Sequence, residues 1–182
     1  MILFPLLAAL YIWVCFDSPG GAFFHQLRMG KDRKPFYILK FRSMTVKPEA
    51  ESGRFDVGDA SRVTRAGRML RKFKLDELPQ FMNVLRGDMS IVGPRPEIKQ
   101  WVEAYPERWK TVLQVKPGIT DPASIRFSNE EDVLAQYDDP VTAYRDIVLP
   151  KKLDIYEAYV SNRTLWGDLK IIFETFVKVV RG

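Results

Sequence analysis

The chain has 182 residues, 46% of them hydrophobic, and a formal net charge of +5 at pH 7, which suits a single domain with a sizeable core. One cysteine, Cys15, excludes an internal disulfide and a thiolate zinc cluster, and one histidine, His25, excludes a multi-histidine metal site. Any catalysis is therefore expected to use carboxylates, lysines, arginines and a hard metal ion, since a lone histidine is more often structural than catalytic.

The first sixteen residues carry no charge. A helix that crosses a bilayer needs about 20 apolar residues, and this segment also lacks the basic region and cleavage site of a signal peptide. Pro5 is expected to kink or interrupt a helix, while Tyr11, Trp13 and Phe16 suit a membrane interface. We expect residues 1–17 to enter the membrane as a re-entrant segment without crossing it; a helix buried in the protein core is the alternative.

The next segments predict a short antiparallel β-hairpin. Residues 22–30 and 34–44 are rich in aromatic and branched side chains and flank a turn at residues 31–33. Residues 45–61 are polar, with glycine and acidic residues, and are expected to form a mobile loop able to order over a ligand.

A basic region runs from Arg28 to Lys74, with 14 Lys and Arg residues against five Asp and Glu, and it includes a predicted basic helix at residues 62–73. Such a region attracts anionic partners, which include nucleic acids, acidic lipid headgroups and phosphorylated substrates. An ordinary solvated basic face is the alternative, and charge alone does not choose among these.

Two adjacent carboxylates, Asp76 and Glu77, lie in the sequence KLDELPQ. Asp is a favoured N-cap, Glu suits the positive end of a helix dipole, and Pro79 is tolerated in a first turn. The apolar spacing that follows predicts a helix from Asp76 to about Leu85. A helix N-terminus also offers N–H groups to a phosphate, so a plain cap and a catalytic site both remain open at this point.

The rest of the chain predicts helices separated by proline-rich turns. Residues 86–97 form a loop stiffened by prolines, a helix spans residues 97–113, and residues 116–124 form a second turn. Further helices are expected to break near three residues, Pro140, Pro150 and Asn162. The fold class is therefore α+β, mainly helical with a small antiparallel β-hairpin.

The C-terminal residues 165–180 carry a broad apolar stripe at helical spacing, with charged residues largely off it. Such a helix either packs on the core or lies in a membrane interface. Together with the apolar N-terminus and the basic region, it favours an amphipathic interfacial helix on a membrane-surface protein. The stripe consists of Leu165, Leu169, Ile172, Phe173, Phe176, Val177 and Val180.

Charged residues on short loops are candidates for binding phosphate. Lys40 and Arg42 follow a predicted strand, Arg86 and Asp88 lie in the sequence LRGD, and Arg95 lies between two prolines. Arginine binds phosphate through a planar two-point fork, and rigid flanks lower the entropy cost of ordering it. Each of these residues taken singly is more often an ordinary surface residue.

Four motifs, ILKFRSM, RKFKLDELPQFMNVLRGDMSIVGPRPE, VKPGIT and LWGDLKI, occur in one order along the chain. Together they resemble the bacterial sugar transferase family of monotopic phosphoglycosyl transferases over essentially the whole sequence. The resemblance implies transfer of a sugar 1-phosphate from a UDP-sugar to undecaprenyl (polyprenol) phosphate with release of UMP. It implies the first membrane step of surface glycan or glycoconjugate biosynthesis, at the cytoplasmic face of the bacterial inner membrane.

The family's catalytic dyad falls on Asp76 and Glu77. The resemblance implies that Asp76 is the nucleophile of a covalent aspartyl-phosphosugar intermediate, and that the dyad holds a Mg²⁺ cofactor; Glu77 is either a metal ligand or a base. UDP-sugar, undecaprenyl phosphate and membrane lipids are the expected partners, and no nucleic acid is expected. The expected substrate-binding residues are Lys40, Arg42, Arg86, Asp88, Arg95 and Arg126.

The sequence departs from the family pattern in two places. Only four residues precede Pro5, so the first arm of the re-entrant helix is expected to be truncated; either the start codon lies upstream or this copy anchors more weakly. Asp121 stands where the family often has glycine, and Arg126 is expected to replace a family arginine whose usual position holds Ser128.

The predicted organisation is a membrane-inserted segment at residues 1–17 and a cytoplasmic catalytic domain at residues 18–182. Two other functions remain possible from the sequence. One is a non-catalytic peripheral membrane protein that binds anionic lipid or nucleic acid, and the other is a Leloir glycosyltransferase that releases UDP. The nucleotide released from a UDP-sugar distinguishes all three.

Overall fold

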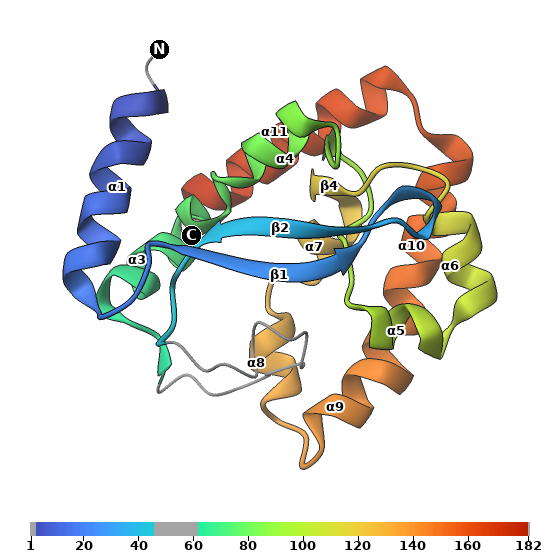
Figure 1. Ribbon diagram of the computed structural model, residues 1–182. Coiled ribbons are helices and arrows are strands. Elements are labelled where there is room, and N and C mark those ends of the chain that lie inside the picture. The colour runs from blue at the N-terminus through green and yellow to red at the C-terminus, as the bar shows by residue number, and fades with distance from the viewer. Residues whose placement is uncertain (1–2, 46–61, 182) are drawn as a thin grey trace.

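The computed structural model describes residues 3–45 and 62–181, and the predicted loop at residues 45–61 lies outside them except for Thr45. This part of the chain is mainly helical and contains two small sheets, one antiparallel and one parallel (Figure 1). The predicted class, mainly helical with a small antiparallel element, is therefore confirmed.

Helix α1 (Leu3–Asp17) packs one face on the protein, where Leu10 and Val14 are buried in a cluster with Phe41 and Leu70. Pro5 lies in the first turn, where its missing N–H would have no helical partner, so the predicted interruption of the helix is wrong. The rest of α1 exposes large apolar side chains, namely Leu6, Tyr11, Ile12, Trp13 and Phe16. Within the described residues no helix is both long and apolar enough to span a bilayer.

The predicted hairpin is confirmed as strands β1 (Phe23–Met29) and β2 (Pro35–Phe41), paired in antiparallel register. The turn between them contains the short 3-10 segment η1 (Lys31–Arg33). Side chains alternate between the two faces of a strand, and the inner face of β2 buries Phe36 and Ile38 against Met89. Lys40 continues this alternation, which directs it toward the segment that carries the two adjacent carboxylates.

Helix α3 (Arg65–Lys72) leads into the 3-10 turn η3 (Leu75–Glu77) and then α4 (Gln80–Arg86). Lys74, between α3 and η3, has a left-handed backbone (φ 54°, ψ 22°), which turns the chain sharply. The predicted helix cap at Asp76 is wrong, because Asp76 lies inside η3 and its side chain caps neither η3 nor α4. Within this turn the Glu77 N–H donates to the Lys74 carbonyl at 3.2 Å, and the Leu78 N–H donates to the Leu75 carbonyl at 3.3 Å.

A parallel pair of three-residue strands, β3 (Ser90–Val92) and β4 (Gly118–Thr120), replaces the two turns expected from the sequence. Their backbones approach so closely that a Cβ atom on Gly118 would lie 2.2 Å from the backbone nitrogen of Gly93. The Gly118 N–H also donates to the Pro94 carbonyl at 3.0 Å. This pairing fixes the loop that carries Arg95.

The predicted helix at residues 97–113 is divided into α5 (Lys99–Ala104) and α6 (Pro106–Val112). The break falls at Tyr105, whose backbone is non-helical (φ −137°, ψ 62°), because a residue before proline is pushed out of the helical region. The remaining elements are α7 (Pro122–Arg126), α8 (Glu130–Leu134), α9 (Pro140–Ala143), the π-helical segment η4 (Tyr144–Val148), α10 (Leu149–Asn162) and α11 (Leu165–Arg181).

The predicted helix boundaries at Pro140 and Asn162 are confirmed. A boundary near Pro150 is also confirmed, because η4 ends at Val148 and α10 begins at Leu149, with Pro150 in its first turn, where proline is tolerated. The largest core cluster lies here and includes Trp101, Trp109, Tyr144, Leu149, Leu153 and Tyr156.

Helix α11 contacts α7, β3 and β4. Ile171 of α11 is buried, and the Thr175 hydroxyl lies 2.5 Å from that of Thr120. The predicted apolar stripe is on a different arc of the helix. Its exposed members, which face away from the core, are Leu165, Leu169, Ile172, Phe173, Phe176 and Val180.

Candidate active site

The two adjacent carboxylates, Asp76 and Glu77, lie between the hairpin and the loop after β3, and both are buried. Glu77 Oε1 accepts hydrogen bonds from Lys40 Nζ at 2.9 Å and from Arg95 Nη2 at 2.7 Å. Lys40 comes from β2, and Arg95 comes from the loop that the β3–β4 pair fixes. Three segments far apart in the sequence therefore meet at Glu77.

Asp76 differs from its neighbour, because its Oδ1 atom is buried and has no hydrogen-bond partner among the described residues. A buried polar atom without a partner is costly and unusual, and such atoms concentrate at functional sites. Burial raises the pKa of Asp76, and Lys40 opposes that rise. The site thus holds a carboxyl oxygen whose hydrogen-bonding capacity is unused.

The pKa values of the pair are displaced in opposite directions. Burial would raise the pKa of Glu77, but the positive charges of Arg95 and Lys40 outweigh burial and hold it well below its ordinary value. Glu77 is therefore ionised at neutral pH. The negative charge of Glu77 in turn contributes to the raised pKa of Asp76.

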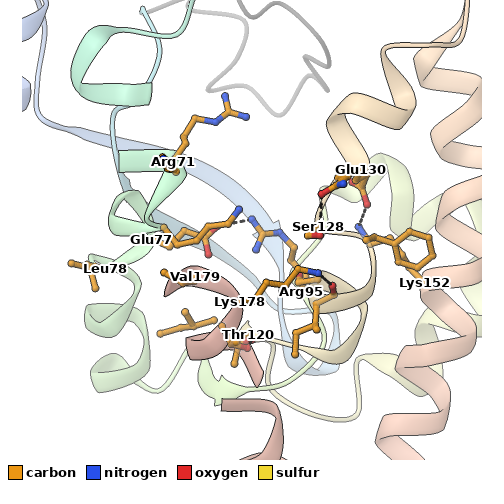
Figure 2. A pocket seen from close by; sticks show the side chains of 18 of the residues that line it. Arg71, Glu77, Leu78, Arg95, Thr120, Ser128, Glu130, Lys152, Lys178 and Val179 are labelled. Atoms are coloured by element: carbon orange, nitrogen blue, oxygen red, sulfur yellow. Dashed lines mark hydrogen bonds and ion pairs between the residues drawn. The ribbon is translucent and has the colours of Figure 1, made fainter. Parts of the chain in front are cut away.

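A cavity of about 640 Å³ opens beside Glu77 (Figure 2), and Asp76 and Lys40 are not among the residues that line it. This is within the usual volume range of small-molecule sites. Its acidic lining residues, among those described, are Glu77 and Glu130. Apolar lining comes from Leu78, Phe81, Ile119, Ile125, Phe127 and Val179. Cationic lining comes from Arg68, Arg71, Lys72, Lys74, Arg95, Lys152 and Lys178, so the cavity suits an anionic ligand.

The structure brings together four of the sequence-predicted site residues, Asp76, Glu77, Lys40 and Arg95. It does not bring Arg42 to this cluster. The Arg42 side chain is buried, and its guanidinium donates to the backbone carbonyls of Val14, Ser18 and Pro19. Arg42 therefore anchors the end of α1 to the hairpin.

Three other predicted substrate-binding residues, Arg86, Asp88 and Arg126, are not among the described residues that line the cavity. Arg86 is the last residue of α4 and Arg126 the last of α7, and both are exposed. The family departure at Asp121 has a structural explanation. Asp121 is the N-cap of α7 and accepts from the Ser124 N–H at 2.8 Å.

Sequence reasoning missed several lining residues. Arg68, Arg71 and Lys72 were predicted only as part of a basic helix, although their spacing of three and four residues places them on one helix face. Glu130 and Lys152 had no comparable local signal, because they meet only when α8 packs beside α10.

The carboxylate pair fits one way of holding magnesium. Mg²⁺ is usually held by one or two protein carboxylates together with substrate phosphates and water, and Asp76 with Glu77 can supply those carboxylates. In residues 3–45 and 62–181, no three His, Cys, Asp or Glu side chains gather into a closed metal site. The residues therefore suit a metal shared with a phosphorylated ligand.

Comparison with known proteins identifies the family. The sequence model of the bacterial sugar transferases matches residues 1–182, the full length of the chain. The chain belongs to the bacterial sugar transferase family. The family resemblance inferred from the four motifs is thereby confirmed.

Several members of the sugar transferase family are similar to this chain over 98% of its length. It is 35% identical over 181 residues to a UDP-N-acetylgalactosamine-undecaprenyl-phosphate N-acetylgalactosaminephosphotransferase of Aeromonas hydrophila, covering 40% of that protein. It is 37% identical over 186 residues to a UDP-glucose:undecaprenyl-phosphate glucose-1-phosphate transferase of Escherichia coli (strain K12), covering 37%. It also covers 86% of the uncharacterized sugar transferase EpsL of Bacillus subtilis (strain 168), at 35% identity.

Proposed function

We propose that this chain is a phosphoglycosyl transferase that moves a sugar 1-phosphate from a UDP-sugar to undecaprenyl phosphate and releases UMP. The observation that carries the proposal is the unpartnered, buried Oδ1 atom of Asp76, whose neighbour Glu77 lines a cavity rich in cations. The names of the similar proteins, two of which include undecaprenyl phosphate and a UDP-sugar, support the choice of substrates.

In the first step, an Asp76 carboxylate oxygen attacks the β-phosphorus of the UDP-sugar. The bond between this phosphorus and the bridging oxygen breaks, and UMP leaves with the bond's electron pair. In the second step, a phosphate oxygen of undecaprenyl phosphate attacks the same phosphorus and releases the Asp76 carboxylate. A carboxylate can attack phosphorus only when the negative charge of the phosphate is masked, and the cavity cations provide much of that masking.

Glu77 has a different role from Asp76 in this proposal. Its carboxylate binds Lys40 and Arg95, and its lowered pKa makes it a weak base. Glu77 therefore positions the two cations next to Asp76 and stays ionised throughout the reaction. The sequence left two roles open for Glu77, metal ligand or base. This assignment excludes the role of base and keeps the role of metal ligand.

We propose Mg²⁺ as the cofactor, held by Asp76 and Glu77 together with phosphate oxygens of the substrate. When bound, it would neutralise part of the charge on the diphosphate. Chelation with EDTA is expected to lower UMP release by at least about a hundredfold, because several kcal/mol of charge stabilisation would be lost. Added Mg²⁺ should restore turnover, Zn²⁺ should not, and full activity in the chelator would contradict the metal proposal.

The direct test is the identity of the nucleotide released. The full chain is incubated with undecaprenyl phosphate and each of several UDP-sugars, and UMP and UDP are separated and quantified. UMP is expected, together with a lipid-linked diphosphate sugar. Release of UDP would instead indicate a Leloir glycosyltransferase, and release of neither nucleotide from any donor would favour a non-catalytic lipid-binding protein.

We also propose that α1 and α11 bind the cytoplasmic face of the bacterial inner membrane. The exposed apolar faces of α1 and α11 support this, since large apolar surfaces rimmed by charge are typical of membrane contact. The basic region adds attraction to anionic headgroups. The proposed organisation remains a membrane-inserted segment at residues 1–17, re-entrant in the bilayer, and a cytoplasmic catalytic domain at residues 18–182.

Binding to vesicles of anionic phospholipid tests the membrane proposal. High salt, on the order of 1 M, is expected to weaken binding by screening charge, and detergent should be needed to abolish it. The double variant Phe173→Asp/Phe176→Asp should be released by salt alone, because both side chains are exposed on the apolar face of α11. The control Lys170→Glu, on the polar side of the same helix, should retain binding in salt; equal release of both variants would exclude the α11 face.

A further inference from the structure

The cavity has two chemically different ends. One end, here called the α3 end, has four cations and lies next to Glu77. The other end, here called the Glu130 end, lies beyond Arg95, so that Arg95 separates Glu130 and Lys152 from Glu77 (Figure 2). The cations of the α3 end are Arg68, Arg71, Lys72 and Lys74.

The Glu130 end is polar, but its charge is internally paired. Glu130 Oε2 lies 3.1 Å from Lys152 Nζ, and the Glu130 side chain keeps 25% of its surface exposed to the cavity and solvent. Ser128 and Asn129 lie beside it with exposed side chains, and the Ser128 hydroxyl donates to Asn129 Oδ1 at 3.1 Å. This end therefore offers both hydrogen-bond donors and acceptors without a net positive charge.

Buried contacts hold Lys152 in place behind Glu130. Only 3% of Lys152 is exposed, and its Nζ lies 3.7 Å from Glu97 Oε1 and 3.3 Å from the Tyr144 hydroxyl. Glu97 is itself held by Arg28 at 3.2 Å. The Lys152 ammonium is thus paired with the carboxylates of Glu97 and Glu130, which makes it a poor ligand for phosphate. Glu130 is held in place with part of its carboxylate facing the cavity.

The two ends match the two halves of a nucleotide sugar. In a UDP-sugar, the sugar and the UMP group lie on opposite sides of the β-phosphorus. The α3 end attracts phosphate oxygens, including those of departing UMP, whereas the Glu130 carboxylate repels them. A carboxylate and neighbouring hydroxyl and amide groups instead suit the hydroxyls of a neutral sugar.

Resting on the proposed function, we propose that the Glu130 end is the sugar subsite. Glu130 accepts hydrogen bonds from hydroxyls of the donor hexose, Lys152 positions Glu130, and Ser128 and Asn129 complete the rim. The substrate class is a UDP-linked neutral hexose or N-acetylhexosamine. A uronic acid is disfavoured, because it brings a second carboxylate close to Glu130.

The test compares wild type with Glu130→Gln on UDP-glucose, UDP-galactose, UDP-N-acetylglucosamine, UDP-N-acetylgalactosamine and UDP-glucuronate, with undecaprenyl phosphate and UMP release as the readout. Wild type is expected to prefer a neutral donor over UDP-glucuronate by at least about tenfold. Glu130→Gln should lower kcat/KM for that donor about 10- to 100-fold, mainly through KM, since it weakens hydrogen bonds to a charged acceptor. Its discrimination against UDP-glucuronate should shrink.

UMP inhibition and thermal unfolding are measured on the same variants. The inhibition constant of UMP should change less than about twofold in Glu130→Gln, and Ser128→Ala should lose a smaller part of the same donor's kcat/KM. Glu107→Gln, an exposed glutamate outside the cavity, serves as the control.

The possible failures are distinguishable. If wild type releases UMP but Glu130→Gln keeps the kcat/KM and the preference for every donor, the subsite is overturned and the transferase function stands. A parallel loss of UMP affinity would assign the Glu130 end to the nucleotide and would also overturn the subsite. No UMP from any donor overturns the proposed function and the subsite together.

Discussion

Asp76→Asn is expected to lower UMP release by at least about three orders of magnitude, because an amide cannot form the covalent link to phosphorus. Asn has nearly the same shape as Asp, so the fold should be retained. A donor labelled in its phosphosugar should attach to wild type in the absence of acceptor and should not attach to the variant. Asp138→Asn, an exposed carboxylate outside the cavity, is the control and should keep full turnover.

The same substitution is expected to stabilise the protein. The pKa of Asp76 is raised by burial above its ordinary value of 3.8, so the folded state holds the proton more tightly than the unfolded state. The ionised carboxylate therefore destabilises the fold increasingly as pH rises above about 3.8. Asp76→Asn should unfold at a higher temperature than wild type at neutral pH, and the difference should vanish below that pH. A variant that keeps a tenth of wild-type turnover would exclude Asp76 as the nucleophile.

Glu77→Gln is expected to lower both stability and activity. The substitution leaves Lys40 and Arg95 without their shared carboxylate. The exposed fraction of the side chain is 19% for Lys40, 32% for Arg95 and 11% for Glu77. Breaking a buried ion pair from one side costs about 3 kcal/mol, which corresponds to a fall of roughly 6–12 °C in Tm for a chain of this size. Turnover should fall as well, because both cations lose their fixed positions beside Asp76.

The pH dependence of Glu77→Gln has the opposite sign from that of Asp76→Asn. The lowered pKa of Glu77 means that its stabilising effect is present above the ordinary value of 4.5 and is lost as the pH falls below it. The stability difference between wild type and variant should therefore be largest above pH 4.5 and shrink in acid. Glu103→Gln, which removes an exposed surface pair with Lys99, should change stability by less than about 1 kcal/mol. Equal Tm losses in the two variants would refute the buried-pair explanation.

The sequence predicted those features that depend on local pattern. Alternating aromatic and branched residues predicted the hairpin, and the long central motif located Asp76, Glu77 and Arg95. The sequence wrongly predicted Asp76 as a helix cap. The actual position of Asp76 depends on the left-handed backbone of Lys74, and a lysine carries no sequence signal for this conformation.

Features that depend on distant contacts were missed or misplaced. Lys40 and Arg42 are two residues apart and equally basic, yet Lys40 reaches Glu77 while Arg42 binds carbonyls at the end of α1. Only the position of α1 in the fold distinguishes them. The parallel pairing of β3 with β4 was missed for a similar reason, since three-residue strands joined through two helices leave no periodic pattern.

Different faces of helix α11 line the cavity and form the exposed apolar surface. Thr175, Lys178 and Val179 line the cavity, while Phe173 and Phe176 are exposed. A helix with its side chains is about 10–12 Å across. If α11 lies in the interface as proposed, its diameter sets the height of the reaction above the hydrocarbon layer. The phosphate of undecaprenyl phosphate would then reach Asp76 at the depth of the lipid headgroups, while its isoprenoid tail stays in the hydrocarbon layer. The helix would hold a fixed distance between the UDP-sugar, which comes from solvent, and the lipid acceptor in the bilayer.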